Sequence, residues 1–247
     1  MPYDAVLSET VTILGHNQDP IEAYLSRPLD QGPHGGVVLI HHMPGYDRQT
    51  KEMARRFATE GYIAIVPNLY HREAPGQSPD DAAAVARNLG GVPDERLVGD
   101  VKGAADYIKG LSNSNQKIGV IGHCSGGRQS FLAACSLELQ AAVDCYGAFV
   151  TKNPPENSPM KVTGLMHLAP QLSCPLLGLF GKEDSYPAPD EVADLDQELT
   201  RLNKVHEFHS YEGAGHAFFA ADRPSYRPEA AVDGWEKIFS FYAKYLR

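Results

Sequence analysis

The chain has 247 residues, 43% of them hydrophobic and 21% charged, which is ordinary for a soluble globular protein. This length suits a single α/β domain over residues 1–247, and no apolar run approaches the ~20 residues of a membrane span. The formal net charge of −9 argues against nucleic-acid and anionic-membrane partners, because both require a basic face.

Cysteine content and the N-terminus bear on location and cofactors. The first residues lack the basic region and apolar core of an export signal. We therefore expect a cytoplasmic protein whose cysteines are reduced. Neither a zinc-ligand spacing nor a glycine-rich nucleotide motif occurs, so no metal and no cofactor is predicted. The four cysteines are Cys124, Cys135, Cys145 and Cys174.

The first predicted elements are a hairpin and two buried strands. Apolar runs at 10–14 and 21–25 flank a polar turn and predict edge strands. The runs at 36–40 and 62–66 are almost continuously apolar, which is typical of buried parallel strands. Between them, Asp47 can cap a helix that ends at a glycine.

Strands and helices then alternate to the end of the chain. A long proline-containing connection at 147–173 interrupts them, and such loops are usually functional. This order predicts a mostly parallel central sheet with helices on both faces and an N-terminal hairpin. The further strands are expected at 118–121, 141–146, 176–180 and 205–211, and the helices at 78–88, 93–111, 128–135, 192–202 and 235–246.

The stretch from Lys117 to Ser130 predicts a nucleophile elbow. An apolar run, a glycine turn and a helical segment follow one another there. Strand and helix pass so closely in an elbow that the positions two before and two after the nucleophile must be small, and Gly122 and Gly126 occupy them. The nucleophile would be Cys124, where serine is commoner. The alternative is a tight turn with a buried, unreactive thiol.

Two further polar residues follow later predicted strands. Asp184 comes after the strand at 176–180, and His216 after the strand at 205–211. The carboxyl ends of parallel strands meet at one edge, where ligands bind. The order nucleophile, acid, histidine is that of an α/β hydrolase. Each residue alone could be a turn or loop residue, but together with Cys124 they predict a catalytic triad on an α/β-hydrolase fold.

Cysteine chemistry needs these partners. A thiol is a weak nucleophile until it loses its proton, which a histidine can accept while an aspartate orients the ring. The oxyanion needs backbone N–H donors. We expect these from Ser125, directly after the nucleophile, and from Met43 in the loop after the first parallel strand, since Pro44 has no N–H.

The chain resembles the dienelactone hydrolases (carboxymethylenebutenolidases) over nearly its full length. This resemblance implies hydrolysis of a lactone or activated ester by Cys124, His216 and Asp184, without a metal or cofactor. The motifs that carry it are G-x-C-x-G-G at 122–127, P-N-L-Y…A-P-G at 67–76, Y-G at 146–147, G-K-E-D at 181–184, G-H-A-F at 215–218 and R-P-S-Y-R-P-E-A-A at 223–231.

Two positions depart from the family pattern. Family enzymes carry a glutamate that controls thiol protonation where this chain has His42, and an arginine for the substrate carboxylate where it has Ala220. Arg72 matches a second family arginine. The resemblance thus implies substrate contacts at His42 and Arg72, and it leaves open substrates other than dienelactone. The remaining strand-end histidines, His41, His71 and His123, are expected to line the pocket rather than bind zinc.

We predict a hydrolase that cleaves a small-molecule lactone or activated carboxylic ester through a thioester intermediate, acting as a monomer or small homo-oligomer. No nucleic acid or membrane partner is expected. Two alternatives are a broad carboxylesterase that acts on ordinary esters and a non-catalytic ligand-binding protein on the same fold.

Overall fold

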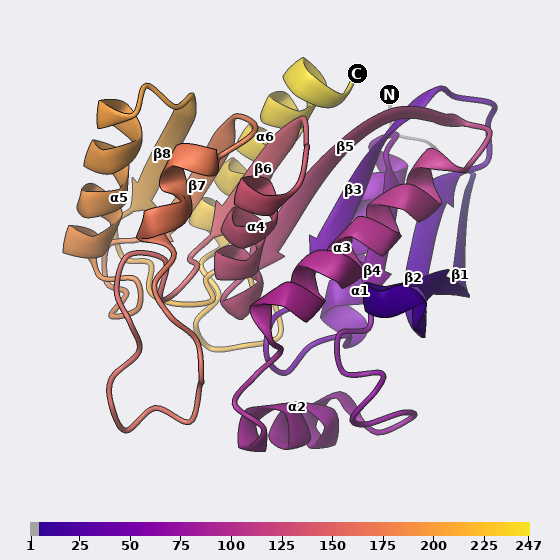
Figure 1. Cartoon of the computed structure of the whole chain (residues 1–247). Coiled ribbons are helices and arrows are strands. Elements are labelled where there is room, and N and C mark those ends of the chain that lie inside the picture. The colour runs from indigo at the N-terminus through magenta and orange to yellow at the C-terminus, as the bar shows by residue number, and fades with distance from the viewer. Residues whose placement is uncertain (1–4) are drawn as a thin grey trace.

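Eight strands form one sheet in the computed structural model, which describes residues 5–247 (Figure 1). The strands are β1 (Val6–Leu14), β2 (Pro20–Pro28), β3 (His34–Ile40), β4 (Ile63–Pro67), β5 (Ser114–His123), β6 (Ala141–Cys145), β7 (Leu176–Gly181) and β8 (His206–Tyr211). Their spatial order is β1-β2-β4-β3-β5-β6-β7-β8. The pairs β1–β2 and β2–β4 are antiparallel, and all other neighbours are parallel. The predicted mostly parallel sheet with an N-terminal hairpin is confirmed.

Helices cover both faces of this sheet (Figure 1). They are α1 (Arg48–Thr59), α2 (Pro79–Asn88), α3 (Asp94–Lys109), α4 (Ser125–Ser136), α5 (Pro189–Arg201) and α6 (Pro228–Leu246), with short 3₁₀ turns η1 (His16–Gln18) and η2 (Met166–Gln171). On one face α1 and α6 bury side chains such as Phe57 and Ile238. On the other, α3, α4 and α5 bury Val101, Phe131 and Leu199. Helix α2 stands apart, beyond the strand ends (Figure 1).

The central strands are buried on both faces. Every residue of β3, β4, β6 and β7 is buried, as expected for strands covered by helices on each side. The edge strand β8 contains no fully buried residue. Within residues 5–247, no helix is both long and apolar enough to cross a membrane.

The tightest contact in the fold is where β5 turns into α4. A Cβ atom added to Gly122 would lie 1.9 Å from the carbonyl oxygen of Gly126. One added to Gly126 would lie 2.3 Å from the carbonyl oxygen of Ile40, at the end of β3. Glycine at both positions therefore lets α4 start directly against β5 and β3.

We predict that Gly126→Ala destabilises the fold by about 2 kcal/mol or more, because the added methyl group meets backbone that has no room to move. The control is Gly110→Ala at the end of α3, where φ is −76° and the nearest atom to an added Cβ is 3.4 Å away. That change should be neutral or stabilising by a few tenths of a kcal/mol. Urea unfolding measures both, and equal stabilities of the two variants would contradict the close contact.

Candidate active site

Three side chains from distant parts of the chain meet at the carboxyl ends of the strands. Cys124 lies between β5 and α4, Asp184 follows β7, and His216 follows β8. Cys124 has φ 58° and ψ −120°, a strained conformation for a residue with a side chain. Its backbone N–H donates to the carbonyl of Cys145 at 3.0 Å, which fixes the turn to β6. The elbow thus holds the thiol in one position above the sheet.

A hydrogen bond joins the imidazole to the carboxylate. His216 Nδ1 lies 2.8 Å from Asp184 Oδ2, and the Asp184 side chain is only 2% exposed. The other carboxylate oxygen accepts the backbone N–H of Tyr186 at 2.8 Å, so the acid is fixed on both sides. The ring of Tyr146 packs edge-on against the imidazole, with 5.2 Å between centroids. With Nδ1 bound to Asp184, Nε2 is the nitrogen that remains for the thiol.

Electrostatics make His216 a stronger base. Burial lowers the pKa of the ring, but hydrogen bonds with Asp184 and with Cys124 outweigh it and raise the pKa to about 10. An imidazole in this setting readily accepts a proton from a neighbouring group. The arrangement can therefore support general base catalysis at this edge of the sheet.

The two residues expected to supply the oxyanion hole border the same cavity. Met43 and Ser125 both border a cavity of about 210 Å³ next to Cys124. Within residues 5–247, neither N–H donates to another protein group. Ser125 is also the first residue of α4, where the helix dipole favours negative charge. Both amides are available to a ligand oxygen in the cavity.

The cavity is closed by α2 and by the connection at 147–173. Helix α2 contributes Arg87, which is exposed and has no ion pair within the described part of the chain. Arg128 also borders the cavity, but both its terminal nitrogens bind Asp94, at 2.8 and 2.9 Å. The lining residues are Met43, Tyr70, Arg87, Val92, Cys124, Ser125, Arg128, Gln129, Ala148, Phe149, Met160 and Val162.

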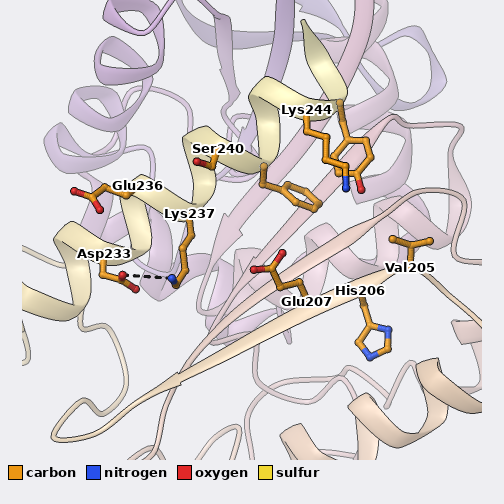
Figure 2. A pocket seen from close by; sticks show the side chains of 10 residues that line it. Val205, His206, Glu207, Asp233, Glu236, Lys237, Ser240 and Lys244 are labelled. Carbon is orange, nitrogen blue, oxygen red and sulfur yellow. Dashed lines mark ion pairs between the residues drawn. The ribbon is translucent and has the colours of Figure 1, made fainter.

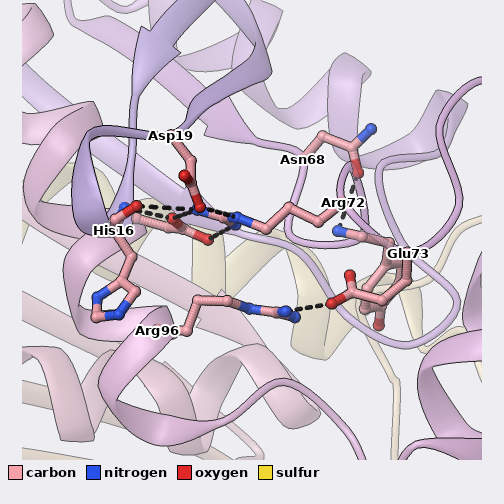
Figure 3. A network of polar contacts seen from close by, with 8 residues as sticks. His16, Asp19, Asn68, Arg72, Glu73 and Arg96 are labelled. Carbon is pink, nitrogen blue, oxygen red and sulfur yellow. Dashed lines mark hydrogen bonds and ion pairs between the residues drawn. The ribbon is translucent and has the colours of Figure 1, made fainter.

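Arg72 does not border this cavity and lies in a network of polar contacts (Figure 3), so the substrate contact expected there stays a prediction. Its guanidinium binds Asp100 through two hydrogen bonds of 2.8 and 2.9 Å and Asp19 through a third of 2.8 Å. Asp100 is completely buried. Arg72 is needed to neutralise this carboxylate, and it ties the hairpin to α3.

His42 is also absent from the cavity lining. Its Nε2 lies 3.1 Å from Oδ2 of Asp47, the residue that caps α1 through Thr50 N–H at 2.8 Å. The substrate contact of His42 therefore stays a prediction. This imidazole instead joins the loop after β3 to the start of α1.

Two other histidines near the elbow are buried and neutral. Burial lowers the pKa of His41 to about 4 and that of His123 to about 3. His41 Nε2 accepts the Leu69 N–H at 3.2 Å, which identifies the ring as the Nδ1-protonated tautomer. Within residues 5–247, no group of three or more His, Cys, Asp or Glu side chains is arranged to hold a metal ion.

A buried carboxyl group supports the elbow from behind. Asp144 is completely buried on β6, and its Oδ1 accepts the Gly147 N–H at 2.7 Å. Its Oδ2 has no hydrogen-bond partner in the described chain. Burial raises the pKa of Asp144 to about 7, against only a small opposing effect of the hydrogen bond from Gly147.

A cavity larger than that at Cys124 lies elsewhere. It measures about 550 Å³ and runs between β8 and α6, lined mainly by charged side chains such as Glu207, Asp233 and Lys237 (Figure 2). None of the residues that meet at the elbow borders it. Its size alone does not outweigh the chemistry at Cys124, so we place the candidate active site at the smaller cavity.

Comparison with known proteins shows which family this chain resembles. Residues 21–246 match the Dienelactone hydrolase family. A protein of Escherichia coli K12 named "Putative carboxymethylenebutenolidase" is 33% identical over 99% of this chain and 89% of its own length. A Bradyrhizobium protein named "Probable 2-oxo-3-(5-oxofuran-2-ylidene)propanoate lactonase" is 27% identical over 94% of this chain and 93% of its own. The crystal structure of a "Putative Dienelactone Hydrolase" from Klebsiella pneumoniae is 30% identical, with a TM-score of 0.86 over 98% of this chain and 100% of that one.

We predict that Arg72→Met lowers the free energy of unfolding by about 3 kcal/mol, because the buried Asp100 carboxylate loses its only charged partner in the described chain and keeps one hydrogen bond, from the His16 N–H. Activity of the folded variant should stay within about twofold. The control is Lys102→Met, which removes an exposed ion pair with Asp106 and should cost less than about 1 kcal/mol. A large loss of activity at unchanged stability would show that Arg72 contacts the substrate.

We predict that the free energy of unfolding of Asp144→Asn, relative to that of wild type, increases as pH rises. The native carboxyl holds its proton up to about pH 7, whereas the unfolded chain releases it near pH 3.8. The native wild type therefore binds more protons between these values and loses stability as pH increases through them. Relative to wild type, the variant should gain about 2 kcal/mol between about pH 5 and pH 8 in urea unfolding. A pH-independent difference would show that Asp144 does not titrate there.

Proposed function

The chain belongs to the dienelactone hydrolase family and is a hydrolase of lactones or esters, and from this premise we propose that it works through a cysteine nucleophile and a thioester intermediate. The observation that carries the proposal is the hydrogen bond of 2.8 Å between His216 and Asp184 at the strand ends beside Cys124. The raised pKa of His216, to which Cys124 contributes, supports the same assignment.

In the first half of the reaction, the sulfur of Cys124 attacks the carbonyl carbon of the substrate, and His216 takes the thiol proton. The negative charge that develops on the carbonyl oxygen is stabilised by the N–H groups of Met43 and Ser125. The C–O bond then breaks, and His216 gives its proton to the departing alkoxide. A thioester on Cys124 and a free hydroxyl group result.

In the second half, His216 removes a proton from water, and the hydroxide attacks the thioester carbonyl. The same two amides stabilise the second tetrahedral intermediate. The C–S bond breaks, the acid is released, and the thiolate regains the proton from His216. Asp184 holds the imidazole in the required orientation throughout.

The substrate contact expected at Arg72 is better assigned to Arg87. This side chain borders the cavity of Cys124 and carries a charge that no described carboxylate neutralises. A cation at this position favours an acyl group that carries a negative charge. The Bradyrhizobium relative is named for a substrate of this kind, a propanoate lactone.

We predict that Cys124→Ala lowers kcat for p-nitrophenyl acetate by about a thousandfold or more while the fold is retained. Stoichiometric iodoacetamide should abolish wild-type activity and label Cys124, because Cys135, Cys145 and Cys174 are buried. Steady-state kinetics and peptide mass spectrometry test both statements. Sustained turnover by Cys124→Ala would refute the cysteine mechanism.

Substrate preference needs a separate measurement. The ratio of kcat/KM for a small lactone to that for a simple alkyl ester distinguishes a lactonase from a broad carboxylesterase. A carboxylate on the acyl group should increase kcat/KM about tenfold in the wild type, and Arg87→Met should remove that gain.

A further inference from the structure

A second cavity adjoins the one that contains the nucleophile. It measures about 200 Å³, and Tyr70 borders both cavities. The two also share the loop after β3, since Met43 lines the first and Gly45 the second. The residues of this second cavity are Glu22, Gly45, Tyr46, Lys51, Asn68, Tyr70, Ala74, Gly76, Gln77, Pro79 and Ala82.

Tyr70 is the residue that the two cavities share. It is 3% exposed and borders the first cavity together with Cys124 and Arg87. The ring packs edge-on against His41, with 4.8 Å between centroids. Its backbone N–H donates to Asn68 Oδ1 at 3.1 Å (Figure 3).

Helix α2 covers both cavities. Ala82, near its start, borders the second cavity, and Arg87, in its last turn, borders the first. Its buried side chains are Ala82, Ala83 and Ala86. Both cavities border this helix and share Tyr70, so a chain that runs along α2 from the first cavity leads toward the second.

The acyl half of a substrate is the part that extends this way. His216 must protonate the leaving group, and His216 borders neither cavity. The leaving group therefore lies outside both, beside the imidazole. The carbonyl oxygen points to Met43 and Ser125, which border the first cavity. The acyl chain then occupies that cavity, and its far end reaches Tyr70.

The second cavity is polar and balanced in charge. It contains one cation, Lys51, and one anion, Glu22. No ion pair within 4.0 Å involves either side chain in the described chain. Lys51 Nζ lies 4.2 Å from the centre of the Tyr46 ring. Asn68 uses its oxygen to accept from Tyr70, so its NH₂ group is left as a donor.

We propose that this second cavity binds hydroxyl groups at the far end of the substrate's acyl chain. A hydroxyl both donates and accepts, which matches the mixture of ammonium, carboxylate and amide groups, and it adds no net charge. The inference rests on the proposed function, because it takes the direction of the acyl chain from the roles of His216 and of the two amides.

The test compares methyl esters of straight-chain acids that differ only in a terminal hydroxyl group. Wild type should prefer the hydroxylated ester by about fivefold or more in kcat/KM at the chain length that reaches past Tyr70. Ala82→Phe fills the second cavity and should abolish that preference. The matched control is Ala84→Phe, on the exposed side of α2, which should keep it. Absence of a preference in wild type at every chain length, or its survival in Ala82→Phe, overturns the proposal.

A second variant is needed in case the phenylalanine displaces α2 and slows the hydrolysis of both esters. Lys51→Met keeps the aliphatic stem and removes one polar partner, so the preference for the hydroxylated ester over the plain ester should fall at least about twofold. An unchanged preference in this variant counts against the cavity.

Failure of the proposed function has a different signature. If wild type does not hydrolyse p-nitrophenyl acetate, the cysteine mechanism is wrong. Ligand-observed NMR with the free hydroxylated and plain acids then tests, without any catalysis, whether the second cavity binds the hydroxyl group. Stronger binding of the hydroxylated acid to wild type than to Ala82→Phe supports the proposal, and equal binding refutes it.

Discussion

The site depends on the close contact between β5 and α4. Gly126 lies against the last carbonyl groups of β3, and Gly122 lies against Gly126, so the helix begins where the strand ends. This forces Cys124 into a backbone conformation that residues with side chains rarely adopt. The strain persists because the surrounding backbone holds it, through the bond from Cys124 to Cys145 among others. As a result, the Cys124 thiol and Ser125, the first residue of α4, border the same small cavity.

The other parts of the site depend on the order of the sheet. Since β5, β6, β7 and β8 are parallel neighbours, the loops that follow them lie side by side at one edge. Asp184 and His216 come from the last two of these loops and are joined by a bond of 2.8 Å. Neither residue needs to be near Cys124 in the chain. Loops can therefore vary in length while the three side chains keep their relation to the strand ends.

The sequence predicted the sheet and the positions of these three residues because both follow from local patterns. Continuous apolar runs mark buried strands, and the glycines around Cys124 mark a turn that few other structures need. It was less informative about the walls of the cavity. Arg72 sits in a motif shared with relatives, but its guanidinium binds Asp100, a contact that no spacing in the sequence indicates. Arg87 was overlooked because a short polar helix looks the same whether it covers a cavity or lies on the surface. For the same reason His42, next to the expected oxyanion loop, gave no sign that it faces Asp47.

The ion pairs of Figure 3 have a consequence for how this enzyme can diversify. Arg72 and Glu73 open the segment that leads to α2, and they bind Asp100 and Arg96, one turn apart on α3. The position of the segment that leads to α2 is thus set in part by α3, a helix that borders neither cavity. Substitutions at residues 96 and 100 could move this segment and make room for larger substrates, without altering any group that contacts the reacting carbonyl. Selection for a new substrate would then appear as substitutions on α3, away from the catalytic residues.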